Sequence, residues 1–506
     1  MRILHTSDWH LGRTFHGRVL DDAHAVFADH LVELARAEAV DAVVVSGDVY
    51  DRAIPPTDSV RLLDETLRRL SDITRVILTP GNHDSARRLG FASDLLREGL
   101  TIRARIADVD RPVIVPGPDG GDGLYVYALP YLDPDAARET LPPLLADRLG
   151  EEMADAARTA PETAGDHSEK TVDDPPGTAS DAPVRRLPRS HEAVVSGALR
   201  LVAADLAARR TAAPARVPAL VMSHAFVVGG LPSEESERDI RVGGVDSVPS
   251  GVFASLGGSP SARECGGLDY VALGHLHRPQ EIRSTGGAGG AGRRNGPDDA
   301  GEAGRPNGPG KASGTGGPDH SSRSGGTGGP EAGESDGPGE SGPPQRDSRP
   351  GPRLVYSGSP LALSFSEAPF PKSSVLVALG PDGVASLERV PAPVPHRIET
   401  VTGTMDELLS PAWDHAAGAW VRAVVRGPMP LGATSRLRER FGQVLAIVRE
   451  EDEEAPRERI VVTRAADPLE VSAQFLAEVA ERAPSPAERA VLARAYEAVL
   501  ASYGSE

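Results

Sequence analysis

The chain has 506 residues, which is enough for two or three domains and at least one large apolar core. Its formal net charge of −19 argues against nucleic-acid binding through a broad positive surface, and leaves any such contact to bound divalent cations or a partner subunit. The single cysteine, Cys265, excludes an intramolecular disulfide and a thiolate-rich zinc cluster, and without a leader or an apolar run of roughly 18 residues we expect a cytoplasmic protein with no membrane span.

Short runs rich in β-branched residues alternate with helical patterns in the first part of the chain. The runs are residues 3–6, 42–46, 76–79, 220–223 and 271–273. Between the first two runs, apolar residues recur every three or four positions at Leu20, Ala23, Phe27, Leu31 and Leu34. A second apolar helical face follows Pro55 and Pro56, at Leu62, Leu63, Leu67 and Leu70. This alternation predicts a layered α/β fold.

Two segments interrupt the α/β pattern. Residues 151–190 are acidic and dominated by Pro, Ala, Thr and Ser, and residues 284–352 consist mainly of Gly, Pro, Ser and charged residues. Neither segment has enough apolar side chains to offset the entropy of ordering, so we interpret both as disordered inserts. A regulatory role for residues 284–352 is the functional alternative.

Beyond the second insert the pattern becomes α/β again. Residues 353–356 and 374–379 are predicted strands that return to the main sheet, residues 420–426 a strand, and residues 435–441 a helix. Two helices are predicted near the end of the sequence: Val471, Phe475 and Val479 share one face, and Ser485, Pro486 and Glu488 form a capping box that starts the second. We therefore expect a domain over 1–396 with two inserts, a small domain over 397–466, and C-terminal helices over 467–506.

Polar side chains follow five of the strand-like runs, at the point where each run ends. They are Asp8 and His10, then Asp48 and Asp51, then Asn82 and His83, then His224, and finally His275 and His277. In layered α/β folds the loops at strand ends converge on one crevice, so these side chains are expected to meet. Taken singly, each histidine is explained as a hydrogen-bonded core residue and each aspartate as a turn former. Five such clusters together favour a metal site.

The mixture of carboxylate, amide and imidazole groups indicates what the site would hold. It suits two divalent cations roughly 3.5–4 Å apart, as in two-metal phosphoester hydrolases. Such a pair needs a bridging carboxylate, and Asp48 is the best candidate because Gly47 beside it lets backbone and ligand approach closely. Without thiolate ligands, Mn²⁺ or a similar ion is favoured over a structural zinc.

The motifs themselves resemble a known family. Residues 8–10 (DWH), 47–52 (GDVYDR), 81–84 (GNHD) and 274–277 (GHLH) match the signature of the calcineurin-like metallophosphoesterases. Within that superfamily, residues 6–12 (TSDWHLG), 79–85 (TPGNHDS), 129–132 (LPYL), 274–280 (GHLHRPQ) and 356–360 (YSGSP) are similar to the SbcD family of bacterial nuclease subunits. That family passes from GHLHRPQ to YSGSP through a short connection, whereas this chain carries the 284–352 insert there.

The resemblance implies a fold and a set of residue roles. The fold is a four-layer sandwich of two mixed β-sheets flanked by helices, with a small α+β capping domain. By the same resemblance, Asp8, His10, Asp48 and His277 hold one cation, and Asp48, Asn82, His224 and His275 hold the other. His83 contacts the scissile phosphate and assists the leaving oxygen, and Asp51 is the carboxylate that pairs with it.

The family's activity and partners are implied in the same way. We expect a metal-dependent DNA nuclease, a double-strand exonuclease and single-strand or hairpin endonuclease, that serves DNA repair, recombination and replication at the nucleoid. The C-terminal helices bind SbcC, a coiled-coil ATPase, and helices over 56–70 and 85–98 form a homodimer within an SbcC–SbcD heterotetramer. Two alternatives remain open: a phosphomonoesterase or small phosphodiesterase that uses the same metals, and a catalytically idle DNA-end scaffold.

Overall fold

The computed structural model describes residues 1–150, 186–233, 247–282 and 351–450, together with 472, 484–492 and 494. Almost all of both predicted inserts, 151–190 and 284–352, and the predicted helical face at Val471, Phe475 and Val479 lie outside these residues. No helix in the described part of the chain is both long and apolar enough to cross a lipid bilayer.

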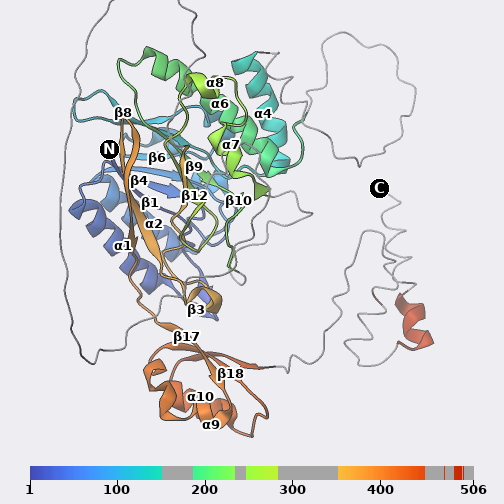
Figure 1. The fold of residues 1–506 in the computed structure, drawn as a ribbon. Helices are drawn as coiled ribbons and strands as arrows, with labels where there is room; N and C mark the ends of the chain where they lie inside the picture. Colours follow the sequence, from blue (N-terminus) through green and yellow to red (C-terminus); the bar gives the residue numbers. More distant parts are fainter. Residues whose placement is uncertain are drawn as a thin grey trace, which may run out of the picture.

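Two six-stranded mixed sheets pack face to face in the centre of the molecule (Figure 1). The first runs in the order β16 (Gly383–Pro391), β15 (Ser373–Gly380), β1 (Arg2–Thr6), β4 (Ala42–Ser46), β5 (Arg75–Thr79) and β6 (Leu100–Ile102). The second runs in the order β13 (Gln280–Ile282), β14 (Arg353–Tyr356), β12 (Tyr270–Gly274), β9 (Ala219–His224), β8 (Asp122–Ala128) and β7 (Val113–Pro116). All five strands that were predicted in the first part of the chain are confirmed, as β1, β4, β5, β9 and β12.

The central strands are buried on both faces, which explains their uninterrupted apolar runs. In β4, Ala42 and Val44 point into the core between the two sheets, whereas Val43 and Val45 point toward the helices on the other side. Alternate residues of a strand face opposite ways, so the apolar residues of β4 contribute to two hydrophobic cores.

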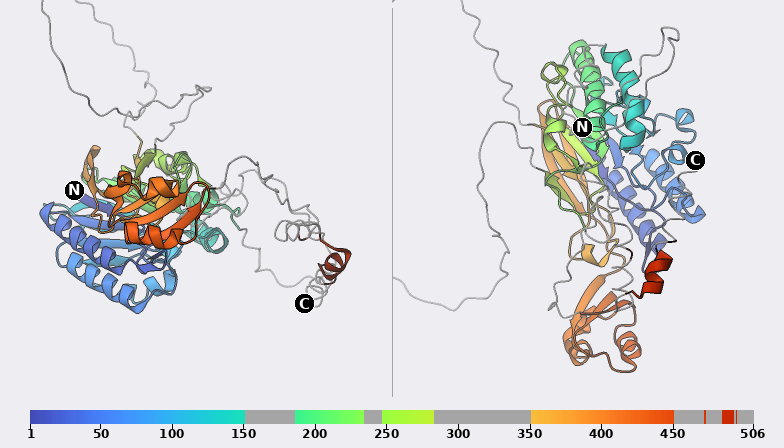
Figure 2. Two further views of the ribbon diagram at one scale, coloured as in Figure 1. Left: turned by 90° about the horizontal axis from the view of Figure 1, so that it is seen from below. Right: turned by 90° about the vertical axis from the view of Figure 1, so that its right-hand side faces the viewer.

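Helices cover both outer faces (Figures 1 and 2). On the first sheet lie α1 (Asp21–Ala37) and α2 (Thr57–Ser71), and on the second lie α4 (Pro134–Leu149), α6 (His191–Ala212), α7 (Ser250–Ala254) and α8 (Ser261–Glu264). Both helices predicted in the first part of the chain are found: Phe27 and Leu31 of α1, and Leu63, Leu67 and Leu70 of α2, are buried against the first sheet. The predicted four-layer arrangement is confirmed.

Two expectations about local structure need correction. The strands β14 and β15 do not return to one sheet, because β14 pairs with β12 in the second sheet and β15 pairs with β1 in the first. Residues 85–98 do not form one helix: α3 (Ala86–Leu89) ends at Gly90, Ala92 adopts a left-handed φ of 59°, and a short 3-10 turn, η1 (Ser93–Leu95), follows. A left-handed residue cannot continue a right-handed helix.

Short elements complete the sandwich. They are the two-residue strands β2 (Thr14–Phe15), β3 (Arg18–Val19), β10 (Phe226–Val227) and β11 (Ser247–Val248), and the 3-10 turns η2 (Ile106–Asp108) and η3 (Phe365–Glu367). The antiparallel pair β2 and β3 lies at the end of the sandwich that faces the next domain (Figure 1).

A separate small α/β unit follows the sandwich and lies at one end of it (Figures 1 and 2). It contains β17 (Ile398–Gly403), α9 (Met405–Leu408), η4 (Pro411–Ala416), β18 (Trp420–Val425), α10 (Ala433–Phe441) and β19 (Val444–Arg449), with the three strands in one parallel sheet. Its own core includes Val401, Leu408, Val421, Leu437 and Phe441. At its junction with the sandwich, the ring centroid of Phe15 lies 5.0 Å from that of Phe365 and 5.7 Å from that of Trp420.

The capping box predicted near the end of the chain is confirmed. Residues 486–492 are helical. The main-chain N–H of Glu488 donates to Ser485 Oγ over 3.3 Å, and the main-chain N–H of Ser485 donates to Glu488 Oε2 over 2.8 Å. These two bonds satisfy donors that the first turn of a helix otherwise leaves unpaired.

Candidate metal centre

The predicted site residues meet at one edge of the two sheets. The strands β1, β4 and β5 run parallel in the first sheet, and β9 and β12 run parallel in the second. Asp8, Asp48, Asn82, His224 and His275 lie at or just beyond the carboxyl ends of these strands. Three groups of side chains there have ligand atoms within 4.8 Å of one another: Asp8 with His10 and His277, His10 with Asp48 and His83, and Asp8 with Asp48 and His224.

Asp48 lies in the middle of the cluster. Its Oδ2 atom is 3.6 Å from Nε2 of His10 and 3.3 Å from Nε2 of His224. Its Oδ1 atom accepts a hydrogen bond from the main-chain N–H of His83 over 2.9 Å. One carboxylate oxygen is thus within reach of both halves of the cluster, which is the geometry that a bridging ligand requires.

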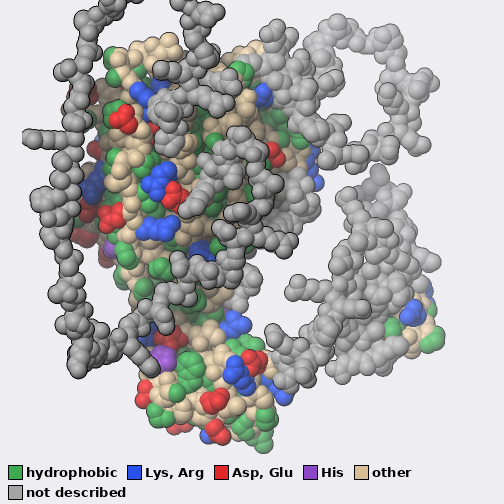
Figure 3. All heavy atoms as spheres, viewed as in Figure 1, with side chains coloured by type: hydrophobic (Ala, Val, Ile, Leu, Met, Phe, Trp, Pro, Cys, Tyr) green, Lys and Arg blue, Asp and Glu red, His purple; other side chains and the backbone are tan. Residues whose placement is uncertain are grey.

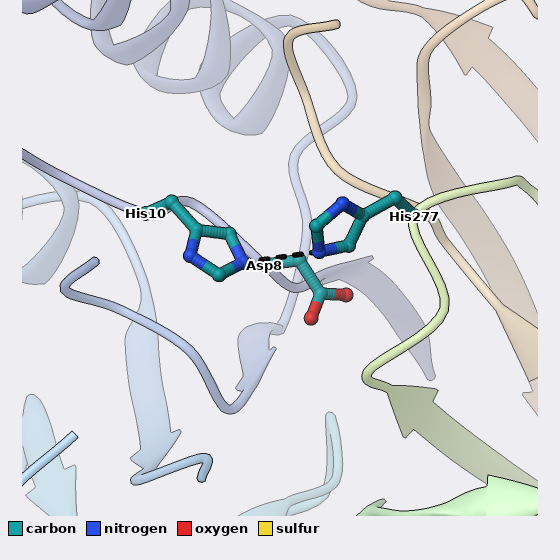
Figure 4. Close-up of side chains that lie close together, drawn as sticks. All are labelled: Asp8, His10 and His277. Carbon is teal, nitrogen blue, oxygen red and sulfur yellow. Dashed lines mark hydrogen bonds between the residues drawn. The ribbon is translucent and has the colours of Figure 1, made fainter. Parts of the chain in front are cut away.

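The first half of the cluster contains Asp8, His10 and His277 (Figure 4). The Nε2 atoms of His10 and His277 face each other at 3.1 Å, with the Asp8 carboxylate close by. The main-chain N–H of His275 donates to Asp8 Oδ1 over 2.9 Å, which fixes the carboxylate in place.

The second half contains His224, Asn82 and His275. His224 Nε2 is 2.8 Å from Asn82 Oδ1, and the ring centroids of His224 and His275 are 5.3 Å apart. His224 Nδ1 is 3.0 Å from the carbonyl oxygen of Ser46, so this ring is held from the strand side while Nε2 faces Asn82 and Asp48.

The backbone around the cluster is sharply bent. Positive φ angles occur at Asp8 (55°), His10 (49°), Asp48 (48°) and His275 (107°), and non-glycine residues in this region tend to be concentrated at functional sites. Glycines allow the loops to approach: a Cβ atom on Gly47 would lie 2.3 Å from Nδ1 of His224, and one on Gly81 would lie 2.2 Å from Oδ1 of Asp48. The close approach expected at Gly47 is therefore present, and Gly81 has the same role.

The donor set fits divalent cations. Asp8 and Asp48 are at most 1 % exposed, and neither carboxylate pairs with a lysine or an arginine within the described residues. Buried carboxylates need compensating positive charge. Two cations among these oxygen and nitrogen atoms would supply the missing partners.

Burial and the close packing of carboxylates and imidazoles also shift the pKa values of the cluster residues. Burial opposes ionisation of Asp48, but His224, His10 and His83 hold its pKa well below the usual value. Burial opposes protonation of His224, but the Asp48 carboxylate outweighs it and raises the His224 pKa to about 9. Burial and His224 lower the pKa of His275 well below its usual value, so His275 is a neutral imidazole. A neutral imidazole is the form that binds a metal.

His83 and Asp51 lie beside the cluster, but their contact differs from the expected one. His83 Nδ1 is 2.8 Å from the main-chain carbonyl oxygen of Asp51, and the ring centroids of His83 and His10 are 4.8 Å apart. The Asp51 carboxylate accepts from Arg13 over 2.9 Å and lies 3.5 Å from His10 Nδ1. Burial opposes ionisation of Asp51, but His10 and Arg13 lower its pKa. Arg13 was not anticipated from the sequence.

Asp84, the last residue of the GNHD motif, has a structural role that was not anticipated either. Its carboxylate accepts main-chain hydrogen bonds from Gly81 (2.9 Å), Val49 (3.0 Å) and Tyr50 (2.9 Å), so it joins the loops that carry Asp48 and Asn82. Burial and the nearby Asp48 charge raise its pKa to about 7. The only indication of this role in the sequence was that Asp84 belongs to the GNHD motif.

Comparison with known proteins identifies the class of the domain. Residues 1–137 match a protein-family model described as a calcineurin-like phosphoesterase, and this segment carries Asp8, His10, Asp48, Asp51, Asn82 and His83. Residues 1–137 are therefore similar to the calcineurin-like phosphoesterases, and the two sheets with flanking helices form the kind of sandwich that this resemblance implies.

Two curated relatives are each named as the D subunit of the nuclease SbcCD. The protein from Rhodobacter capsulatus is 35 % identical over 293 residues, which cover 56 % of this chain and 59 % of that protein. The protein from Bacillus subtilis is 33 % identical over 285 residues, covering 56 % of this chain and 58 % of that protein. The resemblance to SbcD is confirmed by these matches, which span rather more than half the length of each relative.

Proposed function

We propose that this chain is the nuclease subunit of an SbcC–SbcD complex, a two-metal phosphodiesterase that cuts DNA. The position of the Asp48 carboxylate supports this most directly, since one oxygen lies 3.6 Å from His10 and 3.3 Å from His224. Both relatives are named as nuclease subunits, which supports a nucleic acid over a small phosphoester as the substrate. The proposed reactions are double-strand exonuclease and single-strand or hairpin endonuclease cleavage in DNA repair, recombination and replication, in the cytoplasm at the nucleoid.

In this proposal each half of the cluster holds one cation. Asp8, His10, Asp48 and His277 hold the first, and Asp48, Asn82, His224 and His275 hold the second. When bound, the cations would lower the pKa of a water molecule and neutralise charge on the phosphate oxygens. We propose Mn²⁺, because hard oxygen ligands are mixed with imidazoles and no thiolate is present in the set.

His83 is the proposed proton donor to the leaving sugar oxygen. Its Nδ1–H donates to the carbonyl oxygen of Asp51, which fixes the ring and leaves Nε2 to carry the proton that is transferred. Asp51 thus positions His83 through its main chain. The Asp51 carboxylate instead pairs with Arg13 at 2.9 Å and lies 3.5 Å from Nδ1 of His10.

DNA contacts are proposed to be local and shared with SbcC. On the face seen in Figure 3, Lys and Arg side chains lie in small groups beside Asp and Glu. Arg353 and Glu281 are an example of a partly exposed ion pair, at 2.7 Å. This mixed surface supports phosphate binding at the metal centre over binding by a wide positive field. The SbcC-binding helices are proposed over 467–506, most of which lies outside the described residues.

A homodimer is the proposed oligomeric state within an SbcC–SbcD heterotetramer. Phe91 and Leu95 are 82 % and 84 % exposed, and Ile54 is 68 % exposed. Arg88 donates to the carbonyl oxygen of Ala53 over 2.8 Å, so these apolar side chains come from neighbouring segments. Exposed apolar side chains on neighbouring segments favour a protein interface.

Replacing Phe91 and Leu95 together by glutamate is expected to convert the dimer to a monomer, because two charges would be buried in the interface. Analytical ultracentrifugation of the full chain measures the mass. Leu431→Glu is the matched control, since Leu431 is fully exposed in the small domain and its replacement should leave the mass unchanged. A double variant that sediments like the native protein would place the dimer contact elsewhere.

The function is tested by comparing substrates. The purified chain, with and without SbcC, is assayed with Mn²⁺ on labelled linear, hairpin and circular DNA, and on an aryl phosphate. Metal-dependent cleavage of DNA ends and hairpins, abolished by a chelator, is the expected result. Hydrolysis of the aryl phosphate alone would favour a phosphomonoesterase, and cation binding without any hydrolysis would favour the idle scaffold.

A further inference from the structure

A buried ion pair lies directly behind the first half of the metal cluster. Glu367, in η3, is fully buried, and its Oε1 atom is 2.9 Å from Nδ1 of His277. Its other oxygen, Oε2, pairs with the ammonium group of Lys372, which is itself only 6 % exposed. That same oxygen accepts from Ser359 Oγ over 3.3 Å and from the main-chain N–H of Leu363 over 3.2 Å.

Lys372 holds the same histidine from a second direction. Its Nζ atom donates to the carbonyl oxygen of His277 over 3.0 Å and to Ser359 Oγ over 2.8 Å. The pair therefore contacts both the ring and the main chain of His277. Apolar residues of similar size often stabilise a protein as well as a buried ion pair does, so the contribution to stability alone does not explain why this pair is here.

The hydrogen bond to Glu367 determines which nitrogen of His277 is available. A carboxylate only accepts, so Nδ1 must carry the proton, and a neutral imidazole then has its lone pair on Nε2. Nε2 is the atom that faces His10 Nε2 at 3.1 Å inside the cluster (Figure 4). The ion pair thus orients the ring and selects the tautomer that can bind a cation.

The turn that carries Glu367 is itself held from the other side. Phe365, two residues earlier in η3, is 3 % exposed, and its ring centroid lies 5.0 Å from that of Phe15 and 5.1 Å from that of His16. Packed against β2, η3 has little freedom to move away from His277.

We propose that Glu367, anchored by Lys372, is a positioning residue that prepares His277 Nε2 as a cation ligand. This inference rests on the proposed two-metal function. Partners of this kind change metal affinity by about 10–100-fold when they are removed. The effect falls on the cation held by Asp8, His10 and His277, because Glu367 contacts His277, whereas His224 is held by Ser46 and Asn82.

The test is Mn²⁺ titration calorimetry on the full chain after removal of bound metal. Glu367→Gln keeps a hydrogen-bond acceptor but removes the charge. Glu367→Leu combined with Lys372→Met removes the acceptor without leaving a buried charge unpaired. Asp269→Asn is the matched control: Asp269 is a buried carboxylate paired with Arg210 (3.3 Å) and Arg216 (2.7 Å), and it precedes β12 at the end opposite His275.

We expect two binding events in the native protein. One should weaken by about 10-fold in Glu367→Gln and about 100-fold in the double variant, while the other changes less than twofold. Asp269→Asn should leave both affinities unchanged. Histidine-selective ¹⁵N NMR of the metal-free protein should show His277 protonated at Nδ1, and this tautomer should be lost in the double variant.

Two results would overturn the assignment: folded variants that bind both cations with native affinity, or an equal loss at both sites. The second result would mean that the pair supports the fold as a whole. A native protein that binds no pair of cations would instead contradict the proposed function, so the two failures are distinguishable.

Discussion

Asp48→Asn is expected to abolish binding of at least one cation and to lower kcat/KM for DNA cleavage on the order of 10³-fold or more. The reason is that one Asp48 oxygen is within reach of both His10 and His224, at 3.6 and 3.3 Å, so its charge is shared by both halves of the cluster. A single preorganised charge-stabilising group contributes roughly 10²–10³-fold to a rate. Asp48→Asn is expected to weaken two such groups, the cations held by the two halves of the cluster. Calorimetric Mn²⁺ titration and cleavage of labelled duplex DNA measure the two effects.

The same substitution at Asp269 provides the control for loss of a buried carboxylate. Asp269→Asn removes a charge of the same kind, 8 % exposed and paired with two arginines, without touching the cluster. It should lower the free energy of unfolding while leaving cation stoichiometry at two. If Asp48→Asn also bound two cations with native affinity, Asp48 would not be the bridging ligand.

The fold was predictable from the sequence where burial leaves a simple pattern. The α2 helix shows one apolar face, and the first four residues of β4 are all apolar because the strand is buried on both faces. By contrast, α6 (His191–Ala212) was missed because its eleven buried residues surround most of the helix and give no single stripe. The separation of β14 and β15 into different sheets was also hidden, since an apolar run does not specify its partner strands.

The candidate site was predictable because parallel strands bring their ends to one edge. Asp8 and Asp48 follow two parallel strands of the first sheet, and His224 ends a strand of the second sheet, which packs against the first. The supporting contacts were not predictable. Glu367 reaches His277 across 90 residues of sequence, and His83 contacts the carbonyl of Asp51 where a carboxylate contact was expected. Such contacts depend on side-chain packing, which periodicity does not encode.

His83→Gln is expected to retain both cations and to lower DNA cleavage by about 10²–10⁴-fold, the usual contribution of a general acid. The structure allows a rival role, because His83 has a ring nitrogen within 4.8 Å of ligand atoms of His10 and Asp48. What favours proton donation is the Nδ1 contact with the Asp51 carbonyl at 2.8 Å, which holds the ring from outside the cluster. Calorimetry counts the cations, and steady-state kinetics gives the rate.

The choice of leaving group separates proton donation from other roles. A sugar oxygen is a poor leaving group and needs a proton, whereas a nitrophenolate departs without one. His83→Gln should therefore impair cleavage of DNA strongly and cleavage of bis-nitrophenyl phosphate only slightly. The basic limb of the pH–rate profile should also disappear in the variant, because no acid remains to lose its proton. An equal loss on both substrates would assign His83 to charge stabilisation, and a loss of one cation would make it a metal ligand.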